Sequence, residues 1–378
     1  MSQYPSKNKN ILFAVSSLGL GHATRTLPII RDFELRGFRI FILSDGKALE
    51  YLKQEFPTAR FITSKDYPPL ERGKDLQYYL YICPDLFRTI FTVRREHAET
   101  EKIITDANIC AIFSDGRYGV YSRRIPSFFL THQTQFHVRP RDVWFTPVLH
   151  FFNYSRLKKF DHIFIPDYED ERVSLAGKLS RAHFLKKLPH SYIGTLSSLR
   201  RQNGISEDID YLFTISGFLD EHRPSFIKTL LEQARELPGK KVFVLGNPAS
   251  SEVHHDPEAN ITIYENVSGE KRNELFNRAR FVVSRCGYTT LMDMAELEKP
   301  SLLIPTPNQR EQEYLALWNA EKRIFLTEEG EEQISLAQQI TRVQELLPFP
   351  SSVKTHHALE HIRRTMQNIA DNRFGDIV

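Results

Sequence analysis

Three polar segments, each directly after a short apolar run, carry side chains that could move a proton or hold an anion. They are residues 16–25 (SSLGLGHATR), 114–119 (SDGRYG) and 131–135 (THQTQ). A histidine accepts a proton from a hydroxyl near neutral pH. Singly, each polar residue here is typical of a structural turn cap. Because the carboxyl ends of parallel strands meet at one sheet edge, we expect His22, Asp115 and His132 to form an acid–base and anion-binding site.

The first of these segments has two glycines, which would let the backbone approach a phosphate or a ribose closely. Gly19 and Gly21 also fit the start of a dinucleotide-binding fingerprint. However, Thr24 stands where the third glycine would be, and Pro28 would break a helix that begins at the glycines. We therefore expect the loop to continue to about Arg25, with Pro28 in the first helical turn, and we disfavour NAD binding.

A second group follows an apolar run in the other half of the chain, at residues 284–296 (SRCGYTTLMDMAE). Gly287 is followed by hydroxyl side chains where a helix should begin, and helix N-termini favour phosphate. Asp293 lies one helical turn further, within reach of a ribose diol. The alternative is an ordinary threonine-capped helix. Cys286 suits packing better than nucleophilic attack, because no base stands beside it in the sequence.

Apolar runs of four or five residues alternate with amphipathic stretches along the whole chain, starting at residues 11–15 and ending at 301–304. This alternation predicts an α/β fold with doubly wound parallel sheets. The polar, irregular stretch around residues 186–208 suggests a boundary. We expect two Rossmann-like domains, 1–195 and 205–350, with a ligand cleft between them, and a helical tail at 351–378.

The composition limits the classes of partner. Hydrophobic residues make up 41% and charged residues 26%, and 50 Lys and Arg against 47 Asp and Glu give a net charge of +3. This balance excludes a disordered chain and does not call for a nucleic-acid partner. The three cysteines lie far apart with no CxxC pair, which disfavours disulfides and cysteine zinc sites. With no apolar run long enough for a membrane helix, we expect a cytoplasmic protein.

Residues 143–159 (VWFTPVLHFFNYSRLKK) combine aromatic and basic side chains. An amphipathic helix of this kind suits a membrane surface, which predicts a peripheral contact at the inner membrane face. The alternative, which we favour, is a helix that packs on the first sheet.

The stretch from Arg285 to Asp293 (RCGYTTLMD) resembles the signature His-Cys-Gly-Trp-Asn-Ser-x-x-Glu of nucleotide-sugar transferases, in the same spacing. Nearly the whole chain resembles the GT-B glycosyltransferases in order, and most closely family 28 and related bacterial transferases. The first glycine loop, ending Gly21-His22, and the later segment 305–313 (PTPNQREQE) also resemble that family. The resemblance implies two Rossmann-like domains that face each other across a cleft, with the acceptor on the first and the donor on the second.

The resemblance implies roles for single residues. The glycine–hydroxyl turn would bind the donor pyrophosphate, Asp293 the ribose, and the 309–313 segment the donor sugar. The donor-binding set is Gly19, Gly21, Ser216, Gly217, Arg285, Gly287, Tyr288, Thr289, Thr290, Asp293, Gln309, Glu311, Gln312 and Glu313. Arg285 replaces the signature's histidine and still suits a pyrophosphate. Gln133 follows His132 where the family has Glu, and such departures leave the donor's base and sugar open.

The expected activity is transfer of a hexosyl or N-acetylhexosaminyl group from a nucleoside diphosphate sugar, a UDP-sugar first, to a hydroxyl of a carbohydrate or lipid-linked acceptor. No Asp-x-Asp motif stands at a strand end, so we expect no metal, and the nucleotide sugar is a substrate rather than a cofactor. His22 is the first choice as base, with Asp115 and His132 as competitors. A sugar-nucleotide 2-epimerase and a non-catalytic nucleotide-sugar-binding protein are the alternatives.

Overall fold

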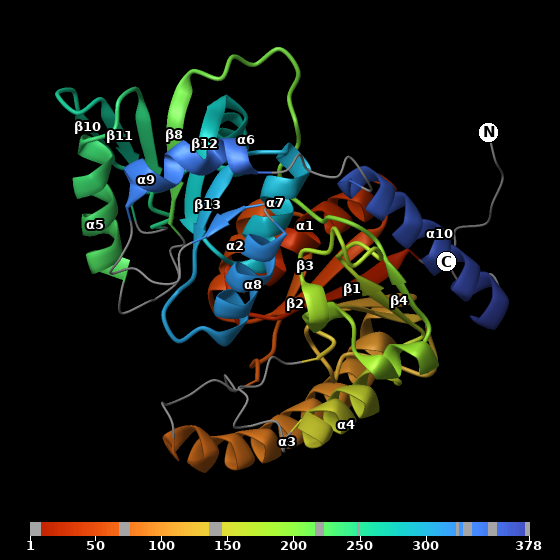
Figure 1. Cartoon of the computed structure of the whole chain (residues 1–378). Helices are drawn as coiled ribbons and strands as arrows, with labels where there is room; N and C mark the ends of the chain where they lie inside the picture. Colours follow the sequence, from red (N-terminus) through yellow and green to blue (C-terminus); the bar gives the residue numbers. More distant parts are fainter. Residues whose placement is uncertain are drawn as a thin grey trace. The chain divides into compact units, whose positions relative to one another are not determined.

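The computed structural model describes residues 9–67, 76–135, 146–215, 223–247, 250–322, 325–327, 335–346 and 354–374. By their contacts, the residues divide into two units. The first unit comprises Met1–Glu169, Lys178–Leu196 and Val353–Val378, and the second comprises Asp170–Gly177 and Ser197–Ser352. Figure 1 follows the chain through both units.

The first unit is built on a seven-stranded parallel sheet with the order β3-β2-β1-β4-β5-β6-β7. Its strands are β1 (Asn10–Val15), β2 (Arg39–Ser44), β3 (Arg60–Thr63), β4 (Ala111–Asp115), β5 (Ser127–Leu130), β6 (His162–Ile165) and β7 (His190–Tyr192). β4 and β5 are buried along their whole length, as expected for apolar runs without alternation. β1 lies between β2 and β4, so the order in which strands are added to the sheet reverses between β1 and β4. Ligands of such sheets bind at this point.

The helices of the first unit are α1 (Leu20–Leu35), α2 (Gly46–Glu55), α3 (Leu76–Ala107), α4 (Thr146–Leu157) and α10 (Thr355–Phe374). Short 3₁₀ turns lie at Gly177–Ser180 and His183–Lys187. The last helix, α10, belongs to this unit because it packs on α1, where Arg363 Nη1 lies 2.9 Å from Asp32 Oδ1. Asp45 caps α2 by accepting a hydrogen bond from Gly46 N at 2.9 Å.

The prediction that the loop continues to about Arg25 before α1 begins is wrong. The helix begins at Leu20, directly after Gly19, and Pro28 lies inside it. A proline removes one backbone donor. That loss is outweighed because α1 buries an apolar face that includes Leu27, Ile30 and Phe33. Gly19 makes the abrupt turn possible with φ of 114°, a value that side-chain-bearing residues rarely adopt.

Helix α4 confirms the expectation that the aromatic segment packs on the first unit, because Leu149, Phe152 and Leu157 are buried. The ring of Phe152 meets the ring of Tyr118 edge-on. Phe151, on the other face of α4, is 72% exposed. Val143, Trp144 and Phe145 of the predicted membrane patch lie outside the described residues.

The second unit repeats the architecture with the strand order β10-β11-β9-β8-β12-β13-β14. Its strands are β8 (Ile209–Thr214), β9 (Lys241–Val244), β10 (Val253–Asp256), β11 (Ile261–Tyr264), β12 (Ala279–Arg285), β13 (Ser301–Ile304) and β14 (Leu326–Thr327). All described pairs are parallel except β10 with β11. The helices are α5 (Arg223–Arg235), α6 (Gly269–Arg278), α7 (Tyr288–Leu297), α8 (Arg310–Glu321) and α9 (Leu336–Thr341), with a 3₁₀ turn at Arg342–Glu345.

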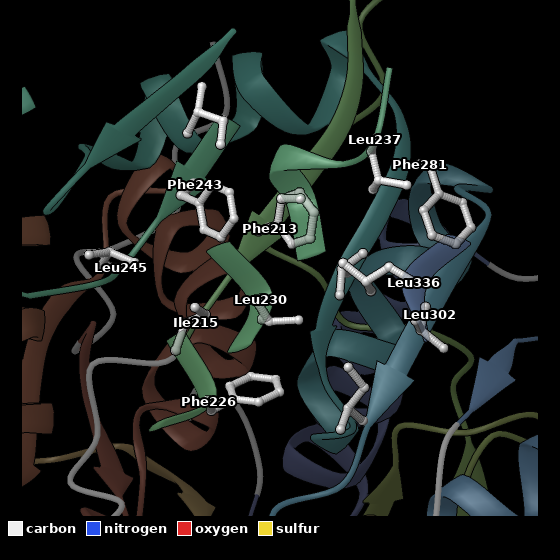
Figure 2. Close-up of a cluster of buried hydrophobic side chains, with 14 of the residues drawn as sticks. Phe213, Ile215, Phe226, Leu230, Leu237, Phe243, Leu245, Phe281, Leu302 and Leu336 are labelled. Carbon is white, nitrogen blue, oxygen red and sulfur yellow. The ribbon is translucent and has the colours of Figure 1, made fainter. Parts of the chain in front are cut away.

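A cluster of buried side chains fixes the centre of this second sheet (Figure 2). The rings of Phe213 on β8 and Phe243 on β9 stack with centroids 4.2 Å apart. Leu230 from α5 and Leu336 from α9 complete the cluster. β8 lies between β9 and β12, so the order in which strands are added also reverses at the centre of this sheet. The two parallel-dominated sheets confirm the predicted α/β fold class.

Candidate active site

Three strand ends of the first unit bring the predicted acid–base residues together. Asp115 is the last residue of β4, paired in register with Val15 at the end of β1. His22 lies in the first turn of α1, which follows β1, and His132 lies just beyond β5. The side chain of Arg25 connects them, since its guanidinium contacts both Asp115 and His132. The site therefore forms at the switch point of the sheet.

Asp115 is fully buried and accepts four hydrogen bonds. Arg25 Nε and Thr26 Oγ1 each donate at 2.7 Å, His22 Nδ1 lies at 2.8 Å, and Arg25 Nη2 also donates. Burial alone would raise the pKa of Asp115, but the charge of Arg25 and the hydrogen bonds from Arg25 and His22 outweigh it and hold this pKa well below its usual range. Asp115 is thus an ionised carboxylate that orients its neighbours and is a poor proton acceptor.

His22 is the member of this group that solvent reaches, with its side chain 24% exposed. Its Nδ1 faces the ionised Asp115, and a carboxylate only accepts hydrogen bonds. In the neutral ring, the Nδ1 atom therefore carries the proton and Nε2 keeps its lone pair. A neutral imidazole with this lone pair on its outward nitrogen is suited to take a proton from a hydroxyl.

The loop that leads into α1 is anchored by a residue that sequence reasoning missed. Asp66, after β3, accepts hydrogen bonds from Ser16 Oγ at 2.9 Å, Ser17 Oγ at 3.0 Å and the Ser17 backbone N–H. Arg117 Nη1 lies 3.3 Å from Asp66 Oδ1, and Arg117 also pairs with the buried Glu96. Burial raises the pKa of Glu96, and the Arg117 charge opposes this rise. A lone aspartate after a strand gives no local pattern by which to find it.

The second predicted group lies at the end of β12. Gly287 is the N-cap residue of α7, and Tyr288, Thr289 and Thr290 form its first turn. Among the described residues, a Cβ atom built on Gly287 would meet only Thr290 Oγ1, at 3.9 Å, so nothing crowds this position. Both threonines are half-buried. A helix N-terminus of this kind favours an anion through the helix dipole.

Arg285, the last residue of β12, lies beside this helix end. Its guanidinium carbon is 3.6 Å from the centroid of the Phe226 ring, and Nη1 donates to Pro305 O at 3.4 Å. The side chain is buried, so its charge acts where water screens little. The fixed cation adds positive potential at the C-terminal edge of the second sheet.

Asp293 lies one helical turn into α7, as predicted, but its carboxylate already has partners. The residue is buried, Ser197 Oγ donates to Oδ1, and Arg272 Nη2 donates to Oδ2 at 2.7 Å. Sequence reasoning missed Arg272, which comes from α6, 21 residues earlier. A ribose that binds Asp293 has to share or replace one of these hydrogen bonds, so the ribose role stays a prediction.

The segment 305–313 forms the turn before α8 and its first residues. Gln309 is the N-cap residue, Gln312 Oε1 accepts from Thr306 N at 2.9 Å, and Glu313 Oε1 accepts from Asn308 N at 3.0 Å.

Burial, aided by the charge of Glu311, raises the pKa of the Cys286 thiol far above its usual range. Cys286 is therefore unreactive, and Glu311 lies close to the start of α7.

Ser216 and Gly217 lie outside the described residues. Within the described ranges, no three His, Cys, Asp or Glu side chains come together as metal ligands. In that same part of the chain, no helix has the length and hydropathy needed to cross a bilayer.

A family model matches most of the second unit and part of the last helix. Residues 233–369 match the model of the glycosyltransferase family 28 C-terminal domain, a range that includes the first turns of α7 and α8. No curated protein matches the sequence.

Solved structures of glycosyltransferases are similar over nearly the whole chain. CalG4, the calicheamicin glycosyltransferase, has a TM-score of 0.60 at 14% identity, covering 98% of this chain and 97% of its own. MurG from Acinetobacter baumannii has a TM-score of 0.58 at 12% identity, covering 95% and 99%. The spinosyn rhamnosyltransferase SpnG complexed with thymidine diphosphate has 0.57 at 13%, covering 95% and 96%. These similarities confirm the predicted GT-B fold.

Proposed function

We propose that this chain, a family 28-like glycosyltransferase with the GT-B fold, transfers a sugar from a nucleoside diphosphate sugar, a UDP-sugar in first place, to a hydroxyl of a carbohydrate or lipid-linked acceptor. One observation carries the proposal. The region that matches the family 28 domain has a helix N-terminus with a glycine N-cap, formed by Gly287, Thr289 and Thr290, at the end of a central strand. Such an end stabilises a diphosphate through backbone N–H groups.

On the donor side, the diphosphate leaving group gains negative charge as the bond to the sugar breaks. The α7 N-terminus and the buried Arg285 cation would neutralise this charge, so the reaction would proceed without a metal ion. Glu311, Gln312 and Glu313 would accept hydrogen bonds from sugar hydroxyls. A carboxylate or amide oxygen accepts more than one hydrogen bond, so the capping bonds in the α8 turn do not prevent this role.

On the acceptor side, His22 would act as the general base. The acceptor oxygen forms a bond to the anomeric carbon, the bond from that carbon to the diphosphate oxygen breaks, and the hydroxyl proton moves to His22 Nε2. Asp115, through Nδ1, stabilises the imidazolium that results. Asp115 and His132 are weaker candidates for the base, because Asp115 is held ionised by its partners and His132 Nδ1 lies 2.7 Å from Arg25 Nη1.

A lipid-linked acceptor would require contact with a membrane surface, and α3 and α4 support it. Phe91 on α3 is 66% exposed, and Phe151 and Val148 on α4 are 72% and 44% exposed. Lys158 and Lys159 follow α4 directly. Exposed aromatic side chains beside cations favour an anionic bilayer. Co-sedimentation with vesicles of anionic lipid tests the contact, and binding that is unchanged in Phe151→Ser would contradict it.

The donor is tested by thermal shift with UDP, GDP and TDP, each with and without EDTA. We expect UDP to stabilise the chain most, with no effect of EDTA. Incubation with UDP-N-acetylglucosamine or UDP-glucose alone should then give slow release of UDP and free sugar. An epimerised donor would instead identify an epimerase, and binding without turnover on any acceptor would identify a sensor.

The base is tested by substitution of His22. His22→Gln should slow hydrolysis or transfer by roughly 10²- to 10⁴-fold and leave UDP binding unchanged. His97→Gln is the matched control, since His97 stacks on Tyr121 and hydrogen-bonds its backbone outside the site. Wild-type rates in His22→Gln would remove this residue as the base.

A further inference from the structure

A single arginine contacts both histidines of the candidate site. Arg25 extends from α1 with its side chain 3% exposed, and it pairs with Asp115 through both Nε and Nη2. Its Nη1 lies 2.7 Å from His132 Nδ1, and its Nη2 lies 3.0 Å from His22 Nδ1. The Nδ1 atoms of both histidines therefore face one buried ion pair.

The two halves of this ion pair impose opposite requirements on a ring nitrogen. A guanidinium only donates hydrogen bonds, so His132 Nδ1 must accept and cannot carry a proton. An ionised carboxylate only accepts, and His22 Nδ1 lies 2.8 Å from Asp115 Oδ1. Arg25 Nη2, 3.0 Å from the same nitrogen, also donates to Asp115 Oδ1, so the closer, anionic carboxylate decides the proton position and His22 Nδ1 carries one. The other neutral tautomer of His22, with its proton on Nε2, would place the lone pair of Nδ1 against the carboxylate in a site that water screens little.

We infer that the Arg25–Asp115 pair holds the two histidines in opposite tautomers, His22 with its proton on Nδ1 and His132 with its proton on Nε2. This inference deepens the proposed function and rests on it for the meaning of the two roles. His22 is then ready to receive a proton at Nε2, whereas His132 can only donate a hydrogen bond at Nε2.

Arg25 is thus a positioning residue that acts through both imidazoles. Because the tautomers are set before any substrate binds, the site needs no proton rearrangement at the start of the reaction. The arrangement also explains why an arginine is required. A lysine ammonium is a single point of charge and lacks the planar fork that reaches Asp115 and His132 at the same time.

The test is a long-range ¹H–¹⁵N correlation spectrum of the full chain labelled with ¹⁵N-histidine. The chain has 14 histidines, so His22→Gln and His132→Gln assign the two signals by their loss. At pH 7.5 and without substrate, we expect the Nδ1–H pattern for His22 and the Nε2–H pattern for His132. A Nδ1–H pattern for His132, or a Nε2–H pattern for His22, overturns the inference from the wild-type spectrum alone.

Two variants then locate the cause. Arg25→Met and Arg25→Lys should abolish the fixed Nε2–H pattern of His132 and give tautomer averaging, with the lysine variant keeping a cation beside Asp115. Arg181→Met is the control, because Arg181 also pairs with a buried aspartate of the first unit, Asp167. It should leave both patterns intact. Wild-type patterns in a folded Arg25→Lys protein would show that Arg25 does not set them.

These outcomes are separate from those that test the proposed function. Absence of nucleotide binding or of transfer would refute the donor or the reaction and leave the tautomer patterns as measured. The opposite result, transfer with a Nδ1–H pattern for His132, would refute the inference and leave the glycosyl transfer.

Discussion

Gly116 and His22 fit together because residue 116 has no side chain. A Cβ atom built on Gly116 would lie 3.0 Å from His22 Cε1 and 3.3 Å from His22 Nδ1. Gly116 also has φ of 77°, in the left-handed region that disfavours a side chain. The turn after β4 thus supplies both Asp115, which orients His22, and the space in which the imidazole lies.

This contact predicts that Gly116→Ala damages the site as well as the fold. The left-handed backbone should lower the free energy of unfolding by about 1–2 kcal/mol. A displaced His22 should slow donor hydrolysis or transfer by roughly ten- to a hundredfold. Urea unfolding and initial rates measure the two effects. Gly37→Ala is the control, since Gly37 has a φ of 79° and a Cβ atom there would lie 3.8 Å from Lys9 Nζ. Equal rates in the two variants would show that the contact with His22 is unimportant.

The buried cation at the end of β12 should strengthen nucleotide binding. Arg285→Met keeps an unbranched side chain at this position and removes the guanidinium that lies over Phe226. We expect UDP affinity to fall roughly tenfold or more, because a hydrogen bond to a charged group contributes about 1.5–3 kcal/mol. Arg280→Met, on the same strand, removes an exposed arginine that pairs with Asp210 and should change nothing. Calorimetric titration with UDP measures both, and equal affinities in the two variants would argue against a diphosphate contact by Arg285.

The pair Arg272–Asp293 allows a test of the ribose prediction. If Asp293 binds the ribose, Asp293→Asn should weaken UDP binding roughly tenfold, whereas Arg272→Met should leave it equal or tighter by freeing the carboxylate. Both variants should unfold more easily, since each breaks a buried ion pair. Binding titrations are therefore made at a temperature where circular dichroism shows both variants folded. Unchanged affinity in folded Asp293→Asn would give Asp293 a structural role alone.

A histidine away from the site predicts how stability changes with pH. Burial first, and then the charges of His361 and His190, lower the pKa of His162 to about 4. The unfolded chain therefore takes up a proton at about pH 6.5 that the folded chain takes up only near pH 4, so stability falls as pH falls through this window.

Because His162 is partly exposed, we expect its share of this loss to be about 2 kcal/mol rather than the full shift. Urea unfolding at pH 7.5, 5.5 and 4.5 measures it, with His162→Gln for comparison. Ser191 Oγ, 2.9 Å from His162 Nε2, can still bond to the amide. A pH dependence of the same size in His162→Gln would assign the effect to other groups.

The sequence by itself determined the elements and the edge of the sheet at which polar residues gather. Apolar runs such as 11–15 and 111–113 became buried parallel strands, and glycine-bearing turns after strands placed His22, Asp115 and Gly287 at strand ends. These features follow from short-range patterns. A strand buried on both faces must be apolar, and a tight turn beside it needs glycine, which adopts backbone angles that other residues rarely do.

Only the tertiary structure decided how the polar groups pair. Arg25 and Asp115 are 90 residues apart, and Ser197 and Asp293 are 96 residues apart. No local pattern records such contacts. Tertiary contacts also decided where α1 begins, because its packing and the hydrogen bonds to Asp115 outweigh the proline that predicted a later start. They decided the position of α10 as well, since this helix was predicted as a tail and packs on α1. The sequence supplied the candidate groups. Pairing across the sheet made Asp115 a fixed anion with Arg25 and His22 beside it, because a buried charge must be neutralised by whichever partners the fold brings near.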